Sequence, residues 1–425
     1  MIGKEQSLDQ PMKRALPWSQ TSAAALILVA ATALPLAVPA PLGLAPLLLL
    51  ATALAGLGPV LGDRRAAFLA LGRLSPALAV FALTLLWSLA GLAWSIAPER
   101  TLMMALRLAG TAACGLLLLA AALDLDPGQR DRLAWWLCIG TIFGTALLLL
   151  ESATDLALLR AIRWLFANRD PVVTLLNRAA TLLVLLMWPV AVVIWRRRGW
   201  AMAAAWLIVA LIVIARLASA SALAACLLGA AMGLAAYAWP VLATWSLAGA
   251  SALAILAAPL AGRLAVIDML RPWVKASGMH RLVIWNFVSE RIGDHPFIGW
   301  GFDTARLIPG GERTVEIATR DGLITGQLLP LHPHNAALQW WLELGMPGAL
   351  LGAALVVVIA RAIAASRWNR VEYAAAQALF GAGLVVSMLS YGIWQFWWQA
   401  ALWFAAALAI AVFPAAPGRA VMKGP

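Results

Sequence analysis

Twelve runs of about 20 mostly apolar residues constrain this chain more than any other feature of its sequence. A helix needs about 20 such residues to cross roughly 30 Å of hydrocarbon, and the runs lack the alternating pattern of barrel strands. Only 12% of the residues are charged, about half the share in a soluble chain. The pattern predicts an all-α, polytopic membrane protein with about 12 transmembrane helices. These are expected near residues 22–39, 42–61, 76–96, 101–123, 133–152, 172–195, 200–217, 219–237, 241–260, 347–365, 372–390 and 394–413.

Clusters of Lys and Arg mark one side of the predicted helices. Cytoplasmic loops carry an excess of both residues, and Arg196, Arg197 and Arg198 form the densest cluster. Because the number of helices is even, both termini are predicted to be cytoplasmic. The first helix is expected to be retained, since its apolar run is too long for a signal peptide and a second run follows at once. The other clusters are Lys4, Lys13 and Arg14; Arg64, Arg65 and Arg73; Arg130 and Arg132; Arg361, Arg367 and Arg370; and Arg419 and Lys423.

A long polar segment interrupts the apolar pattern between the ninth and tenth helices. It divides the chain into residues 1–260 with nine predicted helices, residues 261–346, and residues 347–425 with the last three. The segment holds all four histidines, and its stretch "MHRLVIWNFVSERIG" has apolar residues at helical spacing. Loops of this length are usually functional or disordered. We expect a helical cap on the outer side, with short amphipathic helices over the membrane surface.

Three arginines lie within apolar runs, near the outer ends: Arg107, Arg178 and Arg216. A charge at a helix centre costs about 2.5–3.5 kcal/mol on insertion scales, so such residues are functional candidates. Each guanidinium either reaches the lipid headgroups or binds an anion. Both alternatives stay open for Arg107, and we favour anion binding for Arg178 and Arg216. A lipid diphosphate is the natural anion, because the planar guanidinium grips phosphate oxygens bidentately. Nucleic acid is not expected despite the net charge of +12, because the basic residues form no single face with interleaved aromatics.

The stretch "LHPHNAALQWWLELGMPGALLG" is the most informative part of the long loop. Pro333 disfavours helix before it, Asn335 can cap a short amphipathic helix to Leu344, and a new helix is expected from Pro347. This fixes His334 at a helix entrance on the outer surface, where a neutral imidazole could accept a hydroxyl proton. The alternative, a histidine that only hydrogen-bonds the loop, stays open. We expect no metal site, since a third ligand for His332 and His334 is missing nearby.

These residues resemble the O-antigen ligase and polymerase superfamily. In that family a His-Asn pair is followed by Leu, by Glu-x-Gly and by a further Gly, and this stretch is similar to it. The matching residues are His334, Asn335, Leu338, Glu343, Gly345 and Gly348. A second stretch, "RLVIWNFVSERIGDHPFIGWGFD", is similar to the run that precedes the histidine in these proteins. Its matching residues are Arg281, Trp285, His295, Pro296, Gly299, Gly301 and Phe302.

The resemblance implies a bacterial inner-membrane glycosyltransferase with its active site facing the periplasm. Such enzymes transfer a glycan from undecaprenyl diphosphate with inversion at the anomeric carbon, and they use no metal or other cofactor. Carried over by position, Arg216 and Arg281 bind the diphosphate and His334 assists the attacking hydroxyl. Ala215 departs from the Thr-x-Ser-Arg pattern of the family, so the match of Arg216 is less direct. From their position alone, we add Arg178 and Arg291 as diphosphate ligands, with His332 and Asn335 in supporting roles.

Three activities are compatible with the resemblance. An O-antigen ligase transfers the glycan to lipid A–core oligosaccharide, a polymerase transfers it to a second lipid-linked repeat, and a protein O-oligosaccharyltransferase to Ser or Thr. We predict the ligase, because a single outer loop dominates and the C-terminus is compact. A non-enzymatic transporter or flippase for lipid-linked sugar is the alternative from another class. It would favour polar groups near the midplane and an internal repeat, neither of which the sequence contains.

Overall fold

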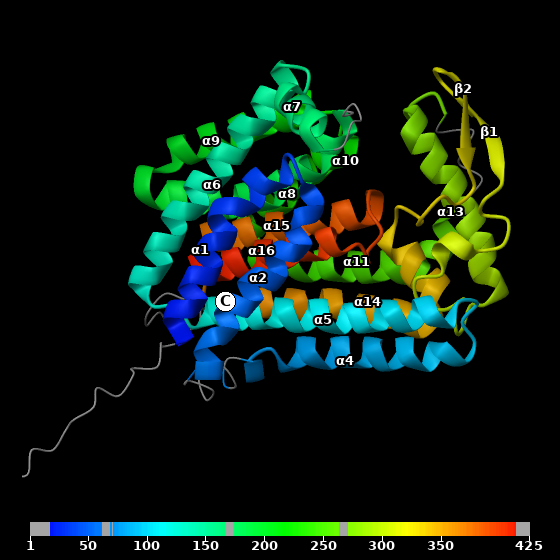
Figure 1. The fold of residues 1–425 in the computed structure, drawn as a ribbon, viewed down its shortest axis with the longest axis horizontal. Helices are drawn as coiled ribbons and strands as arrows, with labels where there is room; N and C mark the ends of the chain where they lie inside the picture. The colour runs from blue at the N-terminus through cyan, green and yellow to red at the C-terminus, as the bar shows by residue number, and fades with distance from the viewer. Residues whose placement is uncertain (1–17, 62–68, 70, 167–172, 263–270, 414–425) are drawn as a thin grey trace, which may run out of the picture.

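Helices running side by side in one bundle make up most of the protein, as a computed structural model shows (Figure 1). The structure describes residues 18–61, 69, 71–166, 173–262 and 271–413. Part of the predicted orientation depends on residues outside this description, namely Lys4, Lys13, Arg14, Arg64, Arg65, Arg419 and Lys423. The bundle helices are α1 (Trp18–Ala37), α2 (Leu44–Leu61), α4 (Ser75–Ala90), α5 (Pro98–Leu123), α6 (Pro127–Ala153), α8 (Leu176–Arg198), α9 (Trp200–Arg216), α10 (Ala220–Ala238), α11 (Pro240–Gly262), α14 (Ala336–Ala364), α15 (Arg370–Leu389) and α16 (Phe396–Val412).

Each of the twelve predicted runs overlaps one of these helices. Within the described ranges, nine helices are long and apolar enough to cross a membrane, and three further apolar helices are shorter. The shorter ones are Pro41–Leu57, Trp200–Arg216 and Phe396–Val412. The multi-pass helical architecture is therefore confirmed. The count of twelve crossings and their orientation stay predictions.

Small residues let the bundle helices approach closely. Gly229 and Gly233 of α10 face α15, and a Cβ atom on either would lie within 3 Å of a backbone oxygen of that helix. Gly140 of α6 meets backbone oxygens of α1 in the same way, and a Cβ atom on Gly144 would meet Leu34 of α1. Glycines four residues apart allow this close backbone contact between membrane helices. Helix α8 lies at the centre and is the most buried of the candidate spans.

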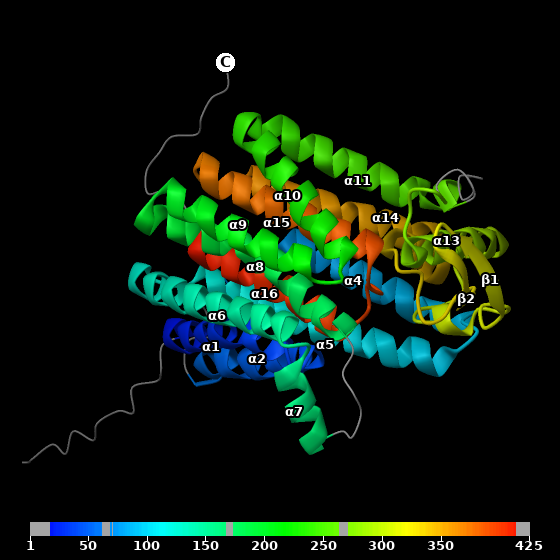
Figure 2. The ribbon, with the colours of Figure 1, turned by 90° about the horizontal axis from the view of Figure 1, so that it is seen from above.

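The predicted long loop contains a helix and a β-hairpin at one end of the bundle (Figure 2). The helix predicted from "MHRLVIWNFVSERIG" is present as α13 (Ala276–Asp294). The hairpin was not predicted, so the all-α assignment is wrong here: β1 (Thr314–Thr319) pairs antiparallel with β2 (Gly322–Gln327), and Thr319 is opposite Gly322. Alternating β-branched residues and an Asp-Gly turn were the available sequence signs of it.

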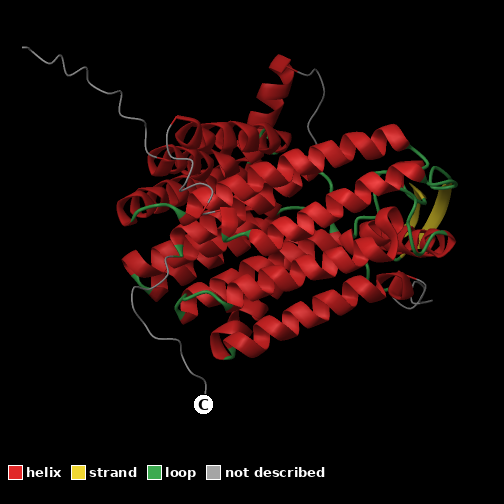
Figure 3. Ribbon diagram, turned by 90° about the horizontal axis from the view of Figure 1, so that it is seen from below, coloured by secondary structure: helices red, strands yellow, loops and turns green. Residues whose placement is uncertain are grey.

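One short helix lies across the direction of the bundle. Helix α7 (Ala157–Phe166) projects from the side of the bundle in two views from opposite sides (Figures 2 and 3). The Glu151 carboxylate fixes its start by accepting hydrogen bonds from the backbone N–H groups of Leu158 and Leu159, at 3.0 and 3.2 Å. Its neighbour in the fold is α6, which ends at Ala153.

Candidate active site

A kink in α14 organises the end of the bundle that carries the cap. Gly345 has φ 65° and ψ −160°, so the helix breaks between an N-terminal segment and the part that begins near Pro347. The predicted pair of helices, 335–344 and from 347 onward, is therefore confirmed. A Cβ atom on Gly345 would lie 2.6 Å from the carbonyl oxygen of Phe297, so both the backbone conformation and the space require glycine.

The kink frees carbonyl groups that neighbouring segments then bind. The Leu342 oxygen accepts from the Trp300 N–H at 2.9 Å, and the Glu343 oxygen accepts from the Gly301 N–H at 3.0 Å. The Leu344 oxygen accepts from the indole N–H of Trp87 at 2.8 Å. Buried carbonyls without partners are costly. The segment "HPFIGWGF", part of the second family motif, therefore supplies backbone N–H donors to carbonyl oxygens at the break in α14.

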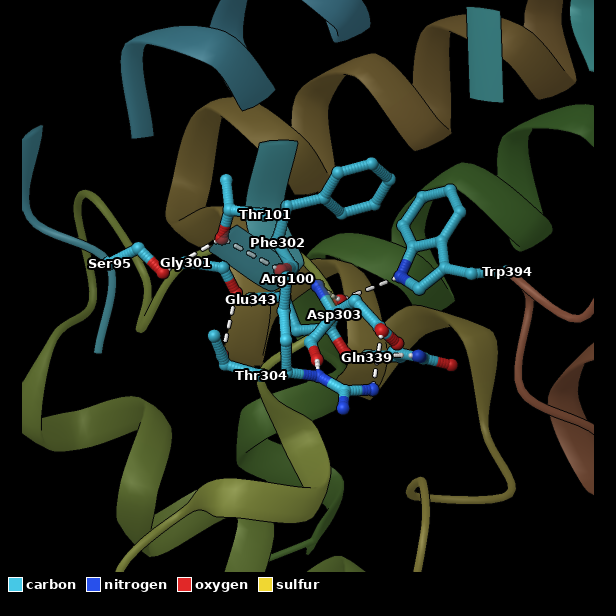
Figure 4. Close-up of polar contacts among 10 residues, drawn as sticks. All are labelled: Ser95, Arg100, Thr101, Gly301, Phe302, Asp303, Thr304, Gln339, Glu343 and Trp394. Carbon is cyan, nitrogen blue, oxygen red and sulfur yellow. Dashed lines mark hydrogen bonds and ion pairs between the residues drawn. The ribbon is translucent and has the colours of Figure 1, made fainter. Parts of the chain in front are cut away.

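The Glu343 carboxylate forms hydrogen bonds with three segments of the chain (Figure 4). We define the Glu343 cluster as Glu343, Gln339, Asp303 and Trp394. The carboxylate is fully buried. Its Oε2 accepts from the Asp303 backbone N–H and from the Trp394 indole, both at 2.7 Å, and its Oε1 accepts from the Gln339 amide at 3.0 Å. Gln339 in turn accepts from the Ile393 N–H at 3.0 Å. The cluster thereby fixes the loop between α15 and α16 against α14.

A second layer of polar contacts joins residues 301–304 to the start of α5 (Figure 4). Arg100 forms an ion pair with Asp303 at 2.9 Å. The Thr101 hydroxyl donates to the Phe302 carbonyl at 2.9 Å, and Ser95 lies 2.8 Å from that hydroxyl. These contacts join α5, residues 301–304 and α14. The frame around the predicted site is thus held by hydrogen bonds from four separate parts of the chain.

His334 lies next to these hydrogen-bonded segments, directly before the N-cap residue of α14. It adopts a positive φ of 56°, a conformation that histidine tolerates better than most residues. Its Nδ1 is hydrogen-bonded to the carbonyl oxygen of Ser390. Because a carbonyl only accepts, Nδ1 carries the proton of the neutral ring, and Nε2 is left as the acceptor. Asn335 caps the helix through the Leu338 N–H at 3.1 Å, which confirms its predicted capping role.

His332 lies against His334 and supports it. Their ring centroids are 4.3 Å apart, and His332 Nδ1 accepts the backbone N–H of His334 at 3.2 Å. His332 Nε2 lies 3.0 Å from the Gln395 amide nitrogen. A Cβ atom on Gly392 would touch the His332 ring at 3.0 Å. The pair is therefore packed on the α15–α16 loop, which we define as residues 390–395.

The α15–α16 loop also carries Tyr391, which the sequence analysis did not identify. The phenol oxygen lies 3.3 Å from the Thr181 hydroxyl of α8. The Tyr391 ring meets Trp397 edge to face at 4.5 Å, and the Arg178 guanidinium lies over the Trp397 ring at 5.5 Å. The charges of Arg178 and Arg281 both act on the phenol. Tyr391 therefore lies in the electrostatic field of one arginine from α8 and one from α13.

Burial and positive charge keep both histidines neutral. Burial, then the neighbouring His334, Arg306 and Arg281, lowers the pKa of His332 to about 3. The pKa of His334 is lowered to about 4, by burial first and then by Arg281 and His280, while the Ser390 hydrogen bond opposes the shift. Burial also lowers the pKa of Arg281. The centre therefore combines a cation with a neutral imidazole that can accept a proton.

Arg281 is the predicted arginine whose charge lowers the pKa of both His332 and His334. Its side chain is partly buried. Within the described part of the chain it forms no ion pair with a carboxylate. Arg178 is also partly buried and likewise has no acidic partner among the described residues. Its guanidinium stacks on the Trp397 ring. Two guanidiniums near one phenol without an acidic partner among the described residues are suited to binding an anion.

The other two predicted arginines, Arg216 and Arg291, have different surroundings. Arg216 is exposed at the end of α9, next to the segment where Asn177 donates to the Ala218 carbonyl at 3.4 Å, so it shares an end of the bundle with Arg178. Arg291 forms an ion pair with Asp294 at 3.0 Å. Ten residues of α13 separate it from Arg281, about 15 Å at 1.5 Å per residue. The structure therefore does not bring Arg291 to the histidines.

Comparison with known proteins concerns this same part of the chain. Residues 207–353, from α9 to the kinked α14, match the family model described as O-antigen ligase. This segment is therefore similar to the O-antigen ligase family. The resemblance predicted from the two motifs is thereby confirmed. Among the described residues, no group of three His, Cys, Asp or Glu side chains could hold a metal ion.

Relatives from bacteria carry a corresponding name. Over 139 residues the chain is 35% identical to a protein of Rickettsia conorii named "Putative polysaccharide ligase", and 34% identical to one of Rickettsia prowazekii with the same description. Each match covers 32% of this chain and 33% of the relative. The chain thus aligns with about a third of the length of the curated relatives it matches. The matched segment is thus similar to polysaccharide ligases, and it lies in a chain with several helices apolar enough to cross a membrane.

Proposed function

We propose that this protein is an O-antigen ligase, which transfers a glycan from undecaprenyl diphosphate to a sugar hydroxyl of lipid A–core oligosaccharide. The observation that carries the proposal is the arrangement of Arg281 and His334. A partly buried guanidinium without an acidic partner among the described residues acts on an imidazole whose Nδ1 is bound to a carbonyl oxygen. This pairing suits a reaction in which a phosphate leaves while a hydroxyl attacks.

The imidazole of His334 is the general base. The hydroxyl oxygen of the acceptor sugar forms a bond to the anomeric carbon of the donor, and the hydroxyl proton passes to Nε2 of His334. The bond between the anomeric carbon and the diphosphate oxygen breaks on the opposite face, which inverts the configuration. The Ser390 carbonyl stabilises the imidazolium that forms, because its hydrogen bond to Nδ1 strengthens when the ring is charged.

The arginines bind the leaving diphosphate. Arg281 and Arg178 approach from α13 and α8, and Arg216 completes the set from the end of α9. Fixed cations stabilise the negative charge that develops on the leaving group, in the place that a metal ion takes in other enzymes. When the anion neutralises Arg281, one cause of the low His334 pKa is removed. Donor binding therefore makes His334 a stronger base.

This chemistry takes place at the periplasmic face of the bacterial inner membrane. Residues 261–346 form the cap on that side, both termini lie in the cytoplasm, and the polyprenyl tail remains in the lipid. The end of the bundle that carries α13 and the hairpin is the side on which donor headgroup and acceptor meet. The positions of Arg178, Arg216 and His334 at that end support this orientation.

The test is glycan transfer by the purified protein in detergent. Undecaprenyl-diphosphate glycan and lipid A–core are supplied together, and the mass of each acceptor is followed. The wild type should add mass to lipid A–core, and His334→Ala should abolish transfer while donor binding remains. Growth of the lipid-linked glycan instead would indicate a polymerase, and modification of a Ser- or Thr-containing protein would indicate an oligosaccharyltransferase. Binding without any transfer would favour a transporter or flippase, and full activity of His334→Ala would refute the general base.

A further inference from the structure

The hydroxyl of Tyr391 is weakly hydrogen-bonded in the structure. Thr181 donates its own proton to the Asn177 carbonyl at 2.8 Å, so the contact between Thr181 and Tyr391 needs the proton of the phenol. That contact is 3.3 Å long, whereas hydroxyl hydrogen bonds are typically 2.5–3.0 Å. A stronger acceptor placed beside Tyr391 would therefore take this proton in preference to Thr181.

The Tyr391 ring, in contrast, is firmly positioned. It packs edge to face on Trp397 at 4.5 Å and meets Trp398 at 6.0 Å. The residue before it, Ser390, is bound to His334, and the residue after it, Gly392, packs on the ring of His332. The phenol oxygen is thus fixed relative to the general base. Only the direction of its O–H bond is free to change.

The surroundings of the phenol select for a negatively charged acceptor. The positive charges of Arg178 and Arg281 act on it from two different helices, and Arg178 is stacked over Trp397. Burial raises the pKa of Tyr391 above its ordinary value, although Thr181 and the two arginines oppose the shift. The hydroxyl therefore stays protonated at neutral pH and can donate. An anion that both arginines bind would lie within reach of this donor.

We infer that Tyr391 is a further diphosphate-binding residue, whose hydroxyl turns from Thr181 to donate a hydrogen bond to a phosphate oxygen held between Arg178 and Arg281. This inference rests on the proposed function, since it places the donor diphosphate at the same site. Hydrogen bonds to charged groups are stronger than those between neutral groups. Loss of the hydroxyl should therefore weaken binding of the diphosphate without affecting the polyprenyl tail.

The test compares two lipids that differ only in the headgroup. Undecaprenyl diphosphate and undecaprenol are bound to the purified, full-length protein in detergent. Tyr391→Phe should weaken binding of undecaprenyl diphosphate about tenfold and leave binding of undecaprenol unchanged. In the transfer assay it should raise KM for the donor more than it lowers kcat. Neither result requires that the acceptor be lipid A–core.

Two matched variants separate binding from support of the fold. Tyr373→Phe removes a phenol hydroxyl from another buried Tyr–Thr pair, in which Tyr373 of α15 lies 2.7 Å from Thr244 of α11. This variant should bind undecaprenyl diphosphate and undecaprenol like the wild type. Thr181→Val removes the present partner of Tyr391 but keeps the phenol, so diphosphate affinity should be kept. Equal losses in Thr181→Val and Tyr391→Phe, or wild-type affinity in Tyr391→Phe, would overturn the inference. Inactivity of the wild type in glycan transfer would instead count against the proposed function.

Discussion

Replacing Glu343 by Gln tests whether the Glu343 cluster positions the active site. The change keeps size and shape but replaces one carboxylate oxygen by an NH₂ group. In the native protein Oε2 accepts two hydrogen bonds, from Asp303 and Trp394, and Oε1 accepts one, from Gln339. All three partners are donors. The variant therefore brings a fourth donor into a site that needs only acceptors.

The magnitude follows from the two orientations that the glutamine can take. With NH₂ in the place of Oε2, the N–H groups of Asp303 and Trp394 both lose their acceptor. With NH₂ in the place of Oε1, Gln339 can rotate to accept, but its own NH₂ then faces the Ile393 N–H, which loses the bond it has now. At least one buried donor is left unsatisfied in either case. Each such group costs about 1–3 kcal/mol, which is the expected loss of stability.

Activity should fall further than stability. The cluster fixes the α15–α16 loop, which carries the Ser390 carbonyl that orients His334, and a displacement of about 1 Å at a reacting group can cost roughly 100-fold in rate. We expect Glu343→Gln to lower the thermal unfolding midpoint in detergent and to reduce kcat/KM for glycan transfer at least tenfold. Glu290→Gln on the exposed face of α13 is the matched control. A Glu343→Gln protein with the midpoint and activity of the wild type would refute the reasoning.

Two further predictions concern the kink and the histidines. Gly345→Ala should destabilise the protein by at least about 1–3 kcal/mol, because of the positive φ and the contact with the Phe297 oxygen; Gly249→Ala, in open space on α11, should not, and equal midpoints would contradict this. Lowering the pH from 7 to 5 should also destabilise the folded state. The pKa values of His332 and His334 are lowered to about 3 and 4, so only the unfolded chain binds these protons as the pH falls below about 6.5, which costs about 2 kcal/mol for each histidine at pH 5. Thermal midpoints at both pH values measure this, and His332→Asn should show a smaller drop; an equal drop would assign the acid sensitivity to other groups.

The helices could be predicted from the sequence because lipid imposes a simple rule. Backbone groups in hydrocarbon must be satisfied within their own segment, so a long apolar run predicts a helix. The same reasoning found α13 and the break in α14, where Asn335, Gly345 and Pro347 act locally. It missed the hairpin of residues 314–327, because short exposed strands outside the membrane have no comparable constraint. Its alternation of β-branched residues was weaker than the surrounding helical pattern.

The site was only partly predictable, and the reason is distance along the chain. His334 and Arg281 became candidates through the family resemblance, and Arg178 became one as a charge within an apolar run. Tyr391 and Ser390 act through contacts with residues more than 50 positions away, and nothing local distinguishes them. Arg291 was included for its position in the long loop, and the structure shows it in an ion pair with Asp294; its binding to a diphosphate stays a prediction.

The broken helix α14 has a consequence for how the protein is assembled. The oxygens of Leu342 and Glu343 have partners only when residues 300 and 301 lie against them. If that segment withdrew, these two buried carbonyls would lose their partners, at a cost of about 1–3 kcal/mol for each. We therefore expect the segment around residues 300 and 301 and the helix bundle to fold together. Each part supplies hydrogen-bond partners for backbone groups of the other at this junction. Neither part should therefore keep its native structure alone.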